Sequence, residues 1–171
     1  MKPLHRKKNV LIPGKIQPYF DIRMQKSNDK DDLIEGSITC CNAHNFEVFV
    51  TGKVQRSIFS KMHVLQENDE MFIEAHCKNC GKIISIFNNR QDGYEKYNGK
   101  SLTQRTPAIV HCPQCLESDF SVNIKYEYPA IEELKELGIE EMDNAFTWIS
   151  INLECCKCGK RYNNFVDYEA D

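Results

Sequence analysis

The sequence contains no long apolar run, and its first residues do not predict a secretory leader. No stretch of eighteen apolar residues occurs, so no segment has the length that a transmembrane helix needs. The charged start is followed by only a short apolar run at residues 10–12, which ends at Pro13 and Gly14 and is too short for a signal peptide. We therefore expect a cytoplasmic protein without a membrane partner. In that compartment cysteines tend to bind metal or act in catalysis instead of forming disulfides.

Sequence motifs of catalysis are also missing. There is no phosphate-binding loop, no dinucleotide fingerprint and no nucleophile elbow. The His-x-Glu motif of zinc deaminases does not occur, because His44 and Glu47 have the wrong spacing. A redox dithiol lies at a helix N-terminus, whereas glycine and strand-like residues follow Cys80 and Cys158 here. These absences predict a protein that is not an enzyme and has no small-molecule substrate.

The chain as a whole has no large excess of charge of either sign, but its charged residues are unevenly distributed. The net charge is −3, from 22 basic and 25 acidic residues, which argues against attraction of the whole surface to nucleic acid. Cations gather in residues 1–26 and acids in residues 127–143. A basic arm and an acidic segment each offer a surface to a partner, although charged segments are often simply solvated faces.

Cysteine, by contrast, is abundant and regularly spaced. Nine cysteines occur, and six of them form three pairs with C-x2-C spacing. A fourth pair has the same spacing but ends in histidine, at Cys41 and His44. Two residues between ligands allow one tight turn to direct both side chains at one ion. The four pairs supply eight ligands for two tetrahedral zinc ions per chain: Cys41, His44, Cys77 and Cys80 at the first, and Cys112, Cys115, Cys155 and Cys158 at the second.

The two halves of the chain repeat one pattern. In each half an alternating strand follows the first ligand pair, and the second pair lies between two further strand-like stretches. This repeat favours sequential pairing, in which each half closes its own site, over a cross-braced arrangement that would use the same cysteines. Short strands of this kind provide few core residues. In the first half we expect Phe46, Val48, Val50, Phe72, Ile84 and Ile86 to be in the core.

Each half resembles a zinc ribbon, over residues 34–88 and 107–168. The resemblance implies a mainly β fold with short helices, built from two consecutive ribbon modules. The expected organisation is a basic arm and first strand at residues 1–33, a first ribbon at 34–88, a linker at 89–106 and a second ribbon with an inserted helix at 107–171. In outline this layout also resembles the small two-ribbon subunits of RNA polymerase.

The long connections between the ligand pairs leave room for additional elements. Residues 129–138 predict a short helix, because Pro129 suits a helix start, Gly138 suits a helix end, and Ile131, Leu134 and Leu137 form one apolar stripe. The pattern of residues 55–65 is compatible with either a helix or a strand.

Two cysteines remain after the eight ligands are assigned. Cys40 and Cys156 each stand beside a ligand, and we expect them to be small buried apolar residues, with alternate ligation as the less favoured interpretation. A site with a histidine among its ligands favours zinc, whereas the second site, with four cysteines, leaves zinc and iron open.

The motifs indicate metal and fold but not activity. We expect a non-catalytic zinc-binding interaction module, a protein-binding adaptor within a larger assembly that is related to transcription or nucleic acids. The alternative is a nucleic-acid-binding protein, in which cations interleaved with tyrosines contact a single strand. The residues that would form this interface lie in the basic arm and the linker: Arg6, Lys7, Lys8, Arg90, Tyr94, Lys96, Tyr97, Lys100 and Arg105.

Overall fold

The computed structural model describes residues 11–28, 30–57, 61–65, 70–99 and 106–170. Their secondary structure is mainly β, as the sequence predicts, with eleven strands and one α-helix in the described part of the chain. Nine of these strands form one antiparallel sheet, and β4 (Val54–Arg56) pairs with β5 (Met62–Val64) in a separate hairpin. None of the described helices is long and apolar enough to cross a membrane.

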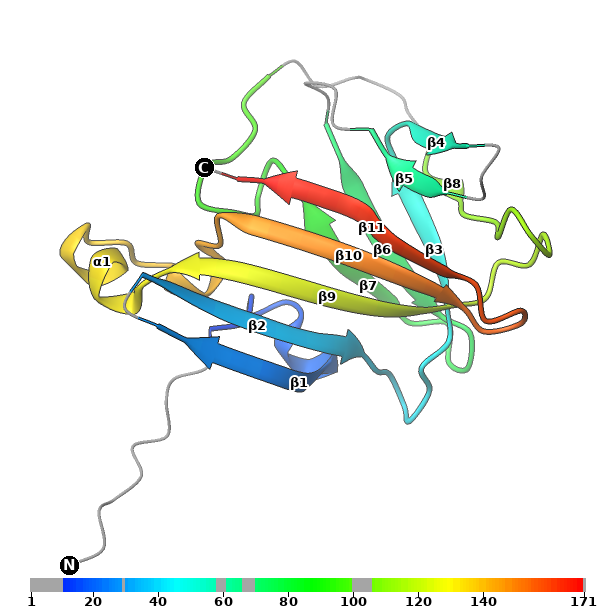
Figure 1. Ribbon diagram of the computed structural model, residues 1–171, viewed down its shortest axis with the longest axis horizontal. Helices are drawn as coiled ribbons and strands as arrows, with labels where there is room; N and C mark the ends of the chain where they lie inside the picture. The colour runs from blue at the N-terminus through cyan, green and yellow to red at the C-terminus, as the bar shows by residue number, and fades with distance from the viewer. Residues whose placement is uncertain (1–10, 29, 58–60, 66–69, 100–105, 171) are drawn as a thin grey trace, which may run out of the picture.

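Five strands form the front layer of the sheet (Figure 1). Their central strand, β9 (Phe120–Pro129), pairs with β2 on one edge and with β10 on the other. Every second side chain of β9, from Phe120 to Tyr128, is buried, as expected for a strand with one face on the core. The other four strands of the layer are β1 (Phe20–Ser27), β2 (Asp31–Ile38), β10 (Trp148–Cys155) and β11 (Arg161–Glu169).

The other four strands of the nine-stranded sheet lie behind this layer in Figure 1. Strand β2 pairs with residues 123–129 of β9, and β3 meets the same strand at the pair Phe46–Phe120. The sheet curls at this junction, so that Phe87 of β7 reaches the ring of Tyr168 on β11, with centroids 5.1 Å apart. This second layer consists of β3 (Phe46–Thr51), β6 (Phe72–Cys77), β7 (Ile83–Asn88) and the short β8 (Ala108–Ile109).

The sheet corrects the expectation of two separate ribbon modules. Strands β2 and β3 come from the first half of the chain, yet both pair with β9 from the second half. The buried apolar residues of both halves form one core. A module of about 60 residues buries little apolar surface and leaves strand edges unpaired, so joining the halves satisfies backbone groups and enlarges the core. The ranges 34–88 and 107–171 therefore do not enclose separate sheets.

The described part of the expected linker is also tied to the rest of the protein. The backbone amides of Gly93, Tyr94 and Glu95 donate to the carbonyls of Asn144, Phe146 and Ala170 respectively. Asp92 is buried and forms an ion pair with Lys15, which fastens the segment before β1. Residues 89–99 are thus anchored to other parts of the chain by these contacts, although Gln91, Tyr94, Glu95, Lys96 and Asn98 are exposed.

The predicted short helix is present as α1 (Ile131–Glu136). Gly138, with φ +67°, ends it, and the amide of Ile139 donates to the carbonyl of Leu134, as in a Schellman cap. Leu134 is fully buried, but Leu137 is 55% exposed and does not belong to the apolar stripe expected of it.

Two other expectations about local structure are resolved. Within residues 55–65, the described positions support the strand alternative, because β4 and β5 form a hairpin there.

Five of the six core residues expected in the first half are buried. The exception is Phe72, which is only half-buried, because the alternation along β6 places Ile73 in the core instead.

Candidate metal centres

The first candidate centre is formed by four cysteines from two turns. The sulfurs of Cys40, Cys41, Cys77 and Cys80 all lie within 4.8 Å of one another. Cys40 Sγ is 3.6 Å from Cys80 Sγ, and Cys41 Sγ is 3.7 Å from Cys77 Sγ. Zinc–sulfur bonds of about 2.3 Å in a tetrahedron separate the sulfurs by about 3.8 Å, whereas a disulfide needs about 2.05 Å. These distances therefore fit a metal ion and not a disulfide.

The second centre has the same construction. The sulfurs of Cys112, Cys115, Cys155 and Cys158 again lie within 4.8 Å of one another. The distance from Cys112 Sγ to Cys158 Sγ is 3.6 Å, and that from Cys115 Sγ to Cys155 Sγ is 3.5 Å. Each half of the chain thus supplies its own tetrad, which confirms the sequential pairing and excludes the cross-braced one. Within the described residues, no other cluster of histidine, cysteine and acidic side chains forms a candidate metal site.

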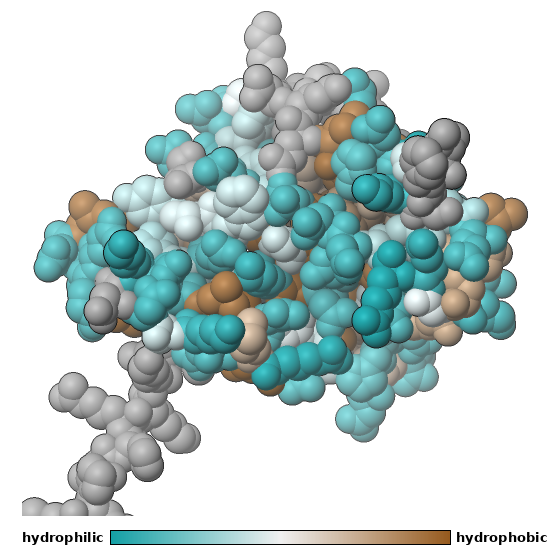
Figure 2. Space-filling view, viewed as in Figure 1, coloured by the Kyte–Doolittle hydropathy of each residue, from teal (hydrophilic) through white to brown (hydrophobic). Residues whose placement is uncertain are grey.

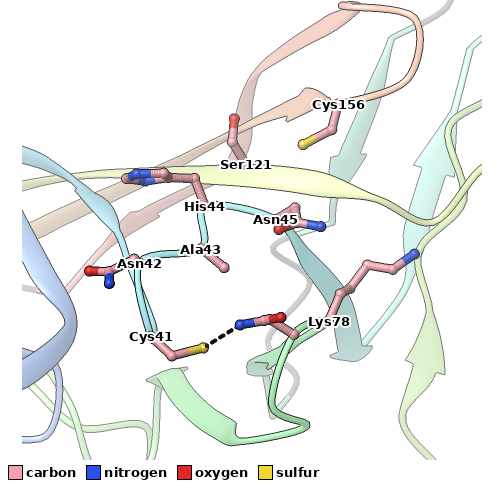
Figure 3. Close-up of a pocket in the computed structure, with 9 residues that line it drawn as sticks. Cys41, Asn42, Ala43, His44, Asn45, Lys78, Ser121 and Cys156 are labelled. Atoms are coloured by element: carbon pink, nitrogen blue, oxygen red, sulfur yellow. Dashed lines mark hydrogen bonds between the residues drawn. The ribbon is translucent and has the colours of Figure 1, made fainter.

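The prediction that His44 is a ligand is wrong, and Cys40 takes its place. Cys40 and Ala43 exchange two backbone hydrogen bonds of 3.0 and 2.7 Å, and Cys41 and Asn42 have φ values of +45° and +62°. This is a two-residue hairpin turn of the primed type, which reverses the chain at Cys41 and Asn42. The sulfurs of Cys40 and Cys41 both lie close to those of Cys77 and Cys80, and the imidazole of His44 points away from Cys41 (Figure 3).

The other three turns follow the geometry that C-x2-C spacing favours. The amides of Gly81, Leu116 and Gly159 donate to the carbonyls of the first cysteine of their turns, each at 2.8 Å. These three residues have φ values between +65° and +74°. Glycine accepts this conformation without strain, whereas Leu116 adopts it with a side chain that is 74% exposed.

Hydrogen bonds favour the thiolate form at one cysteine of each centre. Burial by itself raises the pKa of the Cys112 thiol, but donors from Tyr162 and from the amides of Cys115 and Gln114 lower it to about 6. At Cys77 burial likewise raises the pKa of the thiol, but hydrogen bonds from the amides of Cys80 and Asn79 lower it to about 7. A thiolate is the form that binds metal, so the turns prepare these sulfurs as ligands.

The two centres differ in their outer contacts. The hydroxyl of Tyr162 donates to Cys112 Sγ across 3.0 Å in a buried position. The equivalent position after the first centre holds Ile84, which has no donor group. The first centre instead has the exposed amide of Asn79, whose Nδ2 lies 3.2 Å from Cys41 Sγ.

A hollow of about 590 Å³ lies beside the first centre and reaches the turn of the second (Figure 3). Polar side chains line it, among them His44, Lys78 and Ser121. Cys156 also borders this hollow and is exposed, so the expectation that it is a small buried apolar residue is wrong. In Figure 1 the β6–β7 and β10–β11 turns, which carry ligands of the two centres, lie at the end of the molecule opposite α1.

Three of the residues expected to form the nucleic-acid interface, Arg90, Lys96 and Tyr97, make contacts within the chain. Arg90 Nε lies 3.0 Å from Glu70 Oε1, and its guanidinium stacks on Tyr97 at 5.1 Å. Lys96 Nζ lies 3.7 Å from Glu141, and Tyr94 is 37% exposed. The other candidates are outside the described residues: Arg6, Lys7, Lys8, Lys100 and Arg105.

The molecule therefore presents two complete four-cysteine centres at one end of a curled sheet. Comparison with protein-family models, curated proteins and solved structures gives no match to this chain. What the centres can do chemically follows from their donor sets: four sulfurs at tetrahedral spacing hold a thiophilic ion and join two distant turns.

Proposed function

We propose that both cysteine tetrads hold Zn²⁺ as structural ions and that the protein is a non-catalytic, protein-binding adaptor. The observation that carries the proposal is the completeness of both tetrads, with sulfur–sulfur distances of 3.5–3.7 Å. A bound zinc ion supplies folding energy by fastening the turns that carry its ligands.

The donor set argues for structural ions. A catalytic zinc keeps three protein ligands and leaves the fourth position to water or substrate. Here a fourth sulfur occupies that position in each centre. A metal-dependent hydrolase would need that position open, so one cysteine of a tetrad would have to leave the ion.

The choice of zinc over iron is part of the proposal. With Cys40 in place of His44, both centres have four sulfurs, a donor set that suits either metal. Zinc has no redox chemistry, which favours it where ligands such as Cys41, Cys80 and Cys158 are exposed to solvent. Elemental analysis of the purified protein tests this: two zinc per chain is expected, and a coloured protein that contains mainly iron would refute it.

The adaptor role is supported over nucleic-acid binding by how the charges are used. The net charge is −3, and Arg90 and Lys96 both contact acidic side chains of the same chain. Affinity purification from the native host should recover a protein partner that is retained after nuclease treatment. Binding of a mixed oligonucleotide pool that weakens steeply as salt rises would favour the nucleic-acid alternative instead.

A further inference from the structure

Strand β1 forms an edge of the front layer, and its outer side meets no described strand. It pairs with β2 along one side only and lies at the lower edge of the layer in Figure 1. Six of its eight side chains are exposed, among them Ile22 at 39%. An open edge offers amides and carbonyls to another strand, and its side chains determine whether a second strand is repelled or accepted.

Hydrogen bonds at the two ends of β1 show which of its backbone groups point to the free edge. At one end the amide of Asn28 donates to the carbonyl of Asp31, and at the other the carbonyl of Tyr19 accepts from the residue after β2. In an antiparallel pair, such hydrogen-bonded positions alternate with positions whose amide and carbonyl point outward. Counting inward from both ends places Ile22 and Gln25 at outward positions.

A bulge between Ile22 and Met24 makes this edge complementary to itself. The register with β2 shifts there, so that two residues of β1 lie opposite one of β2. In a regular strand Asp21 and Lys26, five positions apart, would point to opposite faces. Here they share a face, because their partners in β2 are four residues apart. Met24, whose partner lies midway between those two, points to the same face, which is opposite to that of the buried Ile34.

We infer that β1 pairs with β1 of a second copy of this chain, antiparallel about a two-fold axis at Met24. In this register the outward backbone groups at Ile22 of one copy lie opposite those at Gln25 of the other and bond to them. The two Met24 side chains meet at the axis. On either side of it, the carboxylate of Asp21 lies opposite the ammonium of Lys26 from the other copy.

The charges on this edge favour a second copy as the occupant. Asp21 and Lys26 are exposed, and neither forms an ion pair within the described part of the chain. Charges of one sign on an edge strand repel an identical strand, whereas opposite signs on either side of Met24 attract it. The inference depends neither on which metal fills the centres nor on the adaptor function.

Sedimentation equilibrium of the full, metal-loaded chain measures this association. The wild type should have twice the 19.9 kDa mass of one chain, and a protein that stays monomeric up to about 0.5 mM overturns the inference. Asp21→Lys places two cations in each contact, and Lys26→Asp places two carboxylates there. Each variant alone should dimerise roughly 10- to 100-fold more weakly, because two attractive ion pairs become two repulsive ones.

A mixture of the two variants gives the sharpest measurement. In a mixed pair every contact again joins a lysine to an aspartate, so the mixture should recover the dimer that each variant alone has lost. Recovery also shows that both variants are folded. A mixture that stays monomeric, or single variants that dimerise as tightly as the wild type, overturns the pairing through β1.

Lys30→Asp is the matched control, because it makes the same change of charge at an exposed residue between β1 and β2. It should leave the mass of the dimer unchanged. If it weakened the dimer as much as Lys26→Asp does, net charge and not the Asp21–Lys26 contact would be responsible, and the inference would fail.

Discussion

Replacement of Cys40 by serine tests the assignment of the first metal centre. Cys40 Sγ lies 3.6 Å from Cys80 Sγ inside the tetrad, whereas the imidazole of His44 points away from Cys41. Zinc binding by a structural tetrad is worth on the order of 12 kcal/mol, so one of four equivalent ligands accounts for about 3 kcal/mol. Cys40→Ser should therefore lower the zinc affinity of the first centre by roughly 100-fold or more. His44→Ala should leave it unchanged.

The assay is competition with a chromophoric chelator that takes up zinc as each centre releases it. The wild type should release two zinc ions in a narrow range of chelator concentration, and Cys40→Ser should release one of them much earlier. Cys156→Ser is the matched control, because it makes the same chemical change at an exposed cysteine outside both tetrads. If His44→Ala released zinc and Cys40→Ser did not, His44 and not Cys40 would be the fourth ligand of the first centre.

Three further predictions concern the second centre, the shared core and the helix. Tyr162→Phe removes the hydroxyl that lies 3.0 Å from Cys112 Sγ, and it should destabilise the second centre by about 1–2 kcal/mol without affecting release from the first. Chelation of both metals should abolish β-structure in one transition by circular dichroism, because the halves share one sheet; two separate transitions would show that they fold independently. Leu134→Ala should cost about 2–4 kcal/mol in urea unfolding, whereas the exposed Leu137→Ala should change stability by less than about 0.5 kcal/mol.

Local features of this protein were predictable from the sequence because they depend on residues close together in the chain. The C-x2-C spacing is a property of one tight turn, and Gly81 and Gly159 have the positive φ that such a turn needs. The strands around these turns alternate with a period of two, which the sequence displays directly. The repeat of this pattern also predicted the sequential pairing of the turns, since each half holds all the parts of one centre.

The choice between Cys40 and His44 required the three-dimensional structure. Both residues lie close to Cys41 in sequence, and their spacing alone favoured the histidine. The type of turn decided otherwise, since positive φ at Cys41 and Asn42 reverses the chain there and brings the sulfurs of Cys40 and Cys41 together. The exposure of Cys156 likewise depends on the position of the β10–β11 turn relative to the rest of the molecule.

Only the tertiary structure decided how the two halves combine. The alternation in β2, β3 and β9 shows that each has a buried face, but it does not say which strand edges meet. Edge pairing is a contact between residues 74 to 98 positions apart, and it depends on which arrangement buries most apolar surface with all backbone groups paired. The same long-range packing places the β4–β5 hairpin against β11.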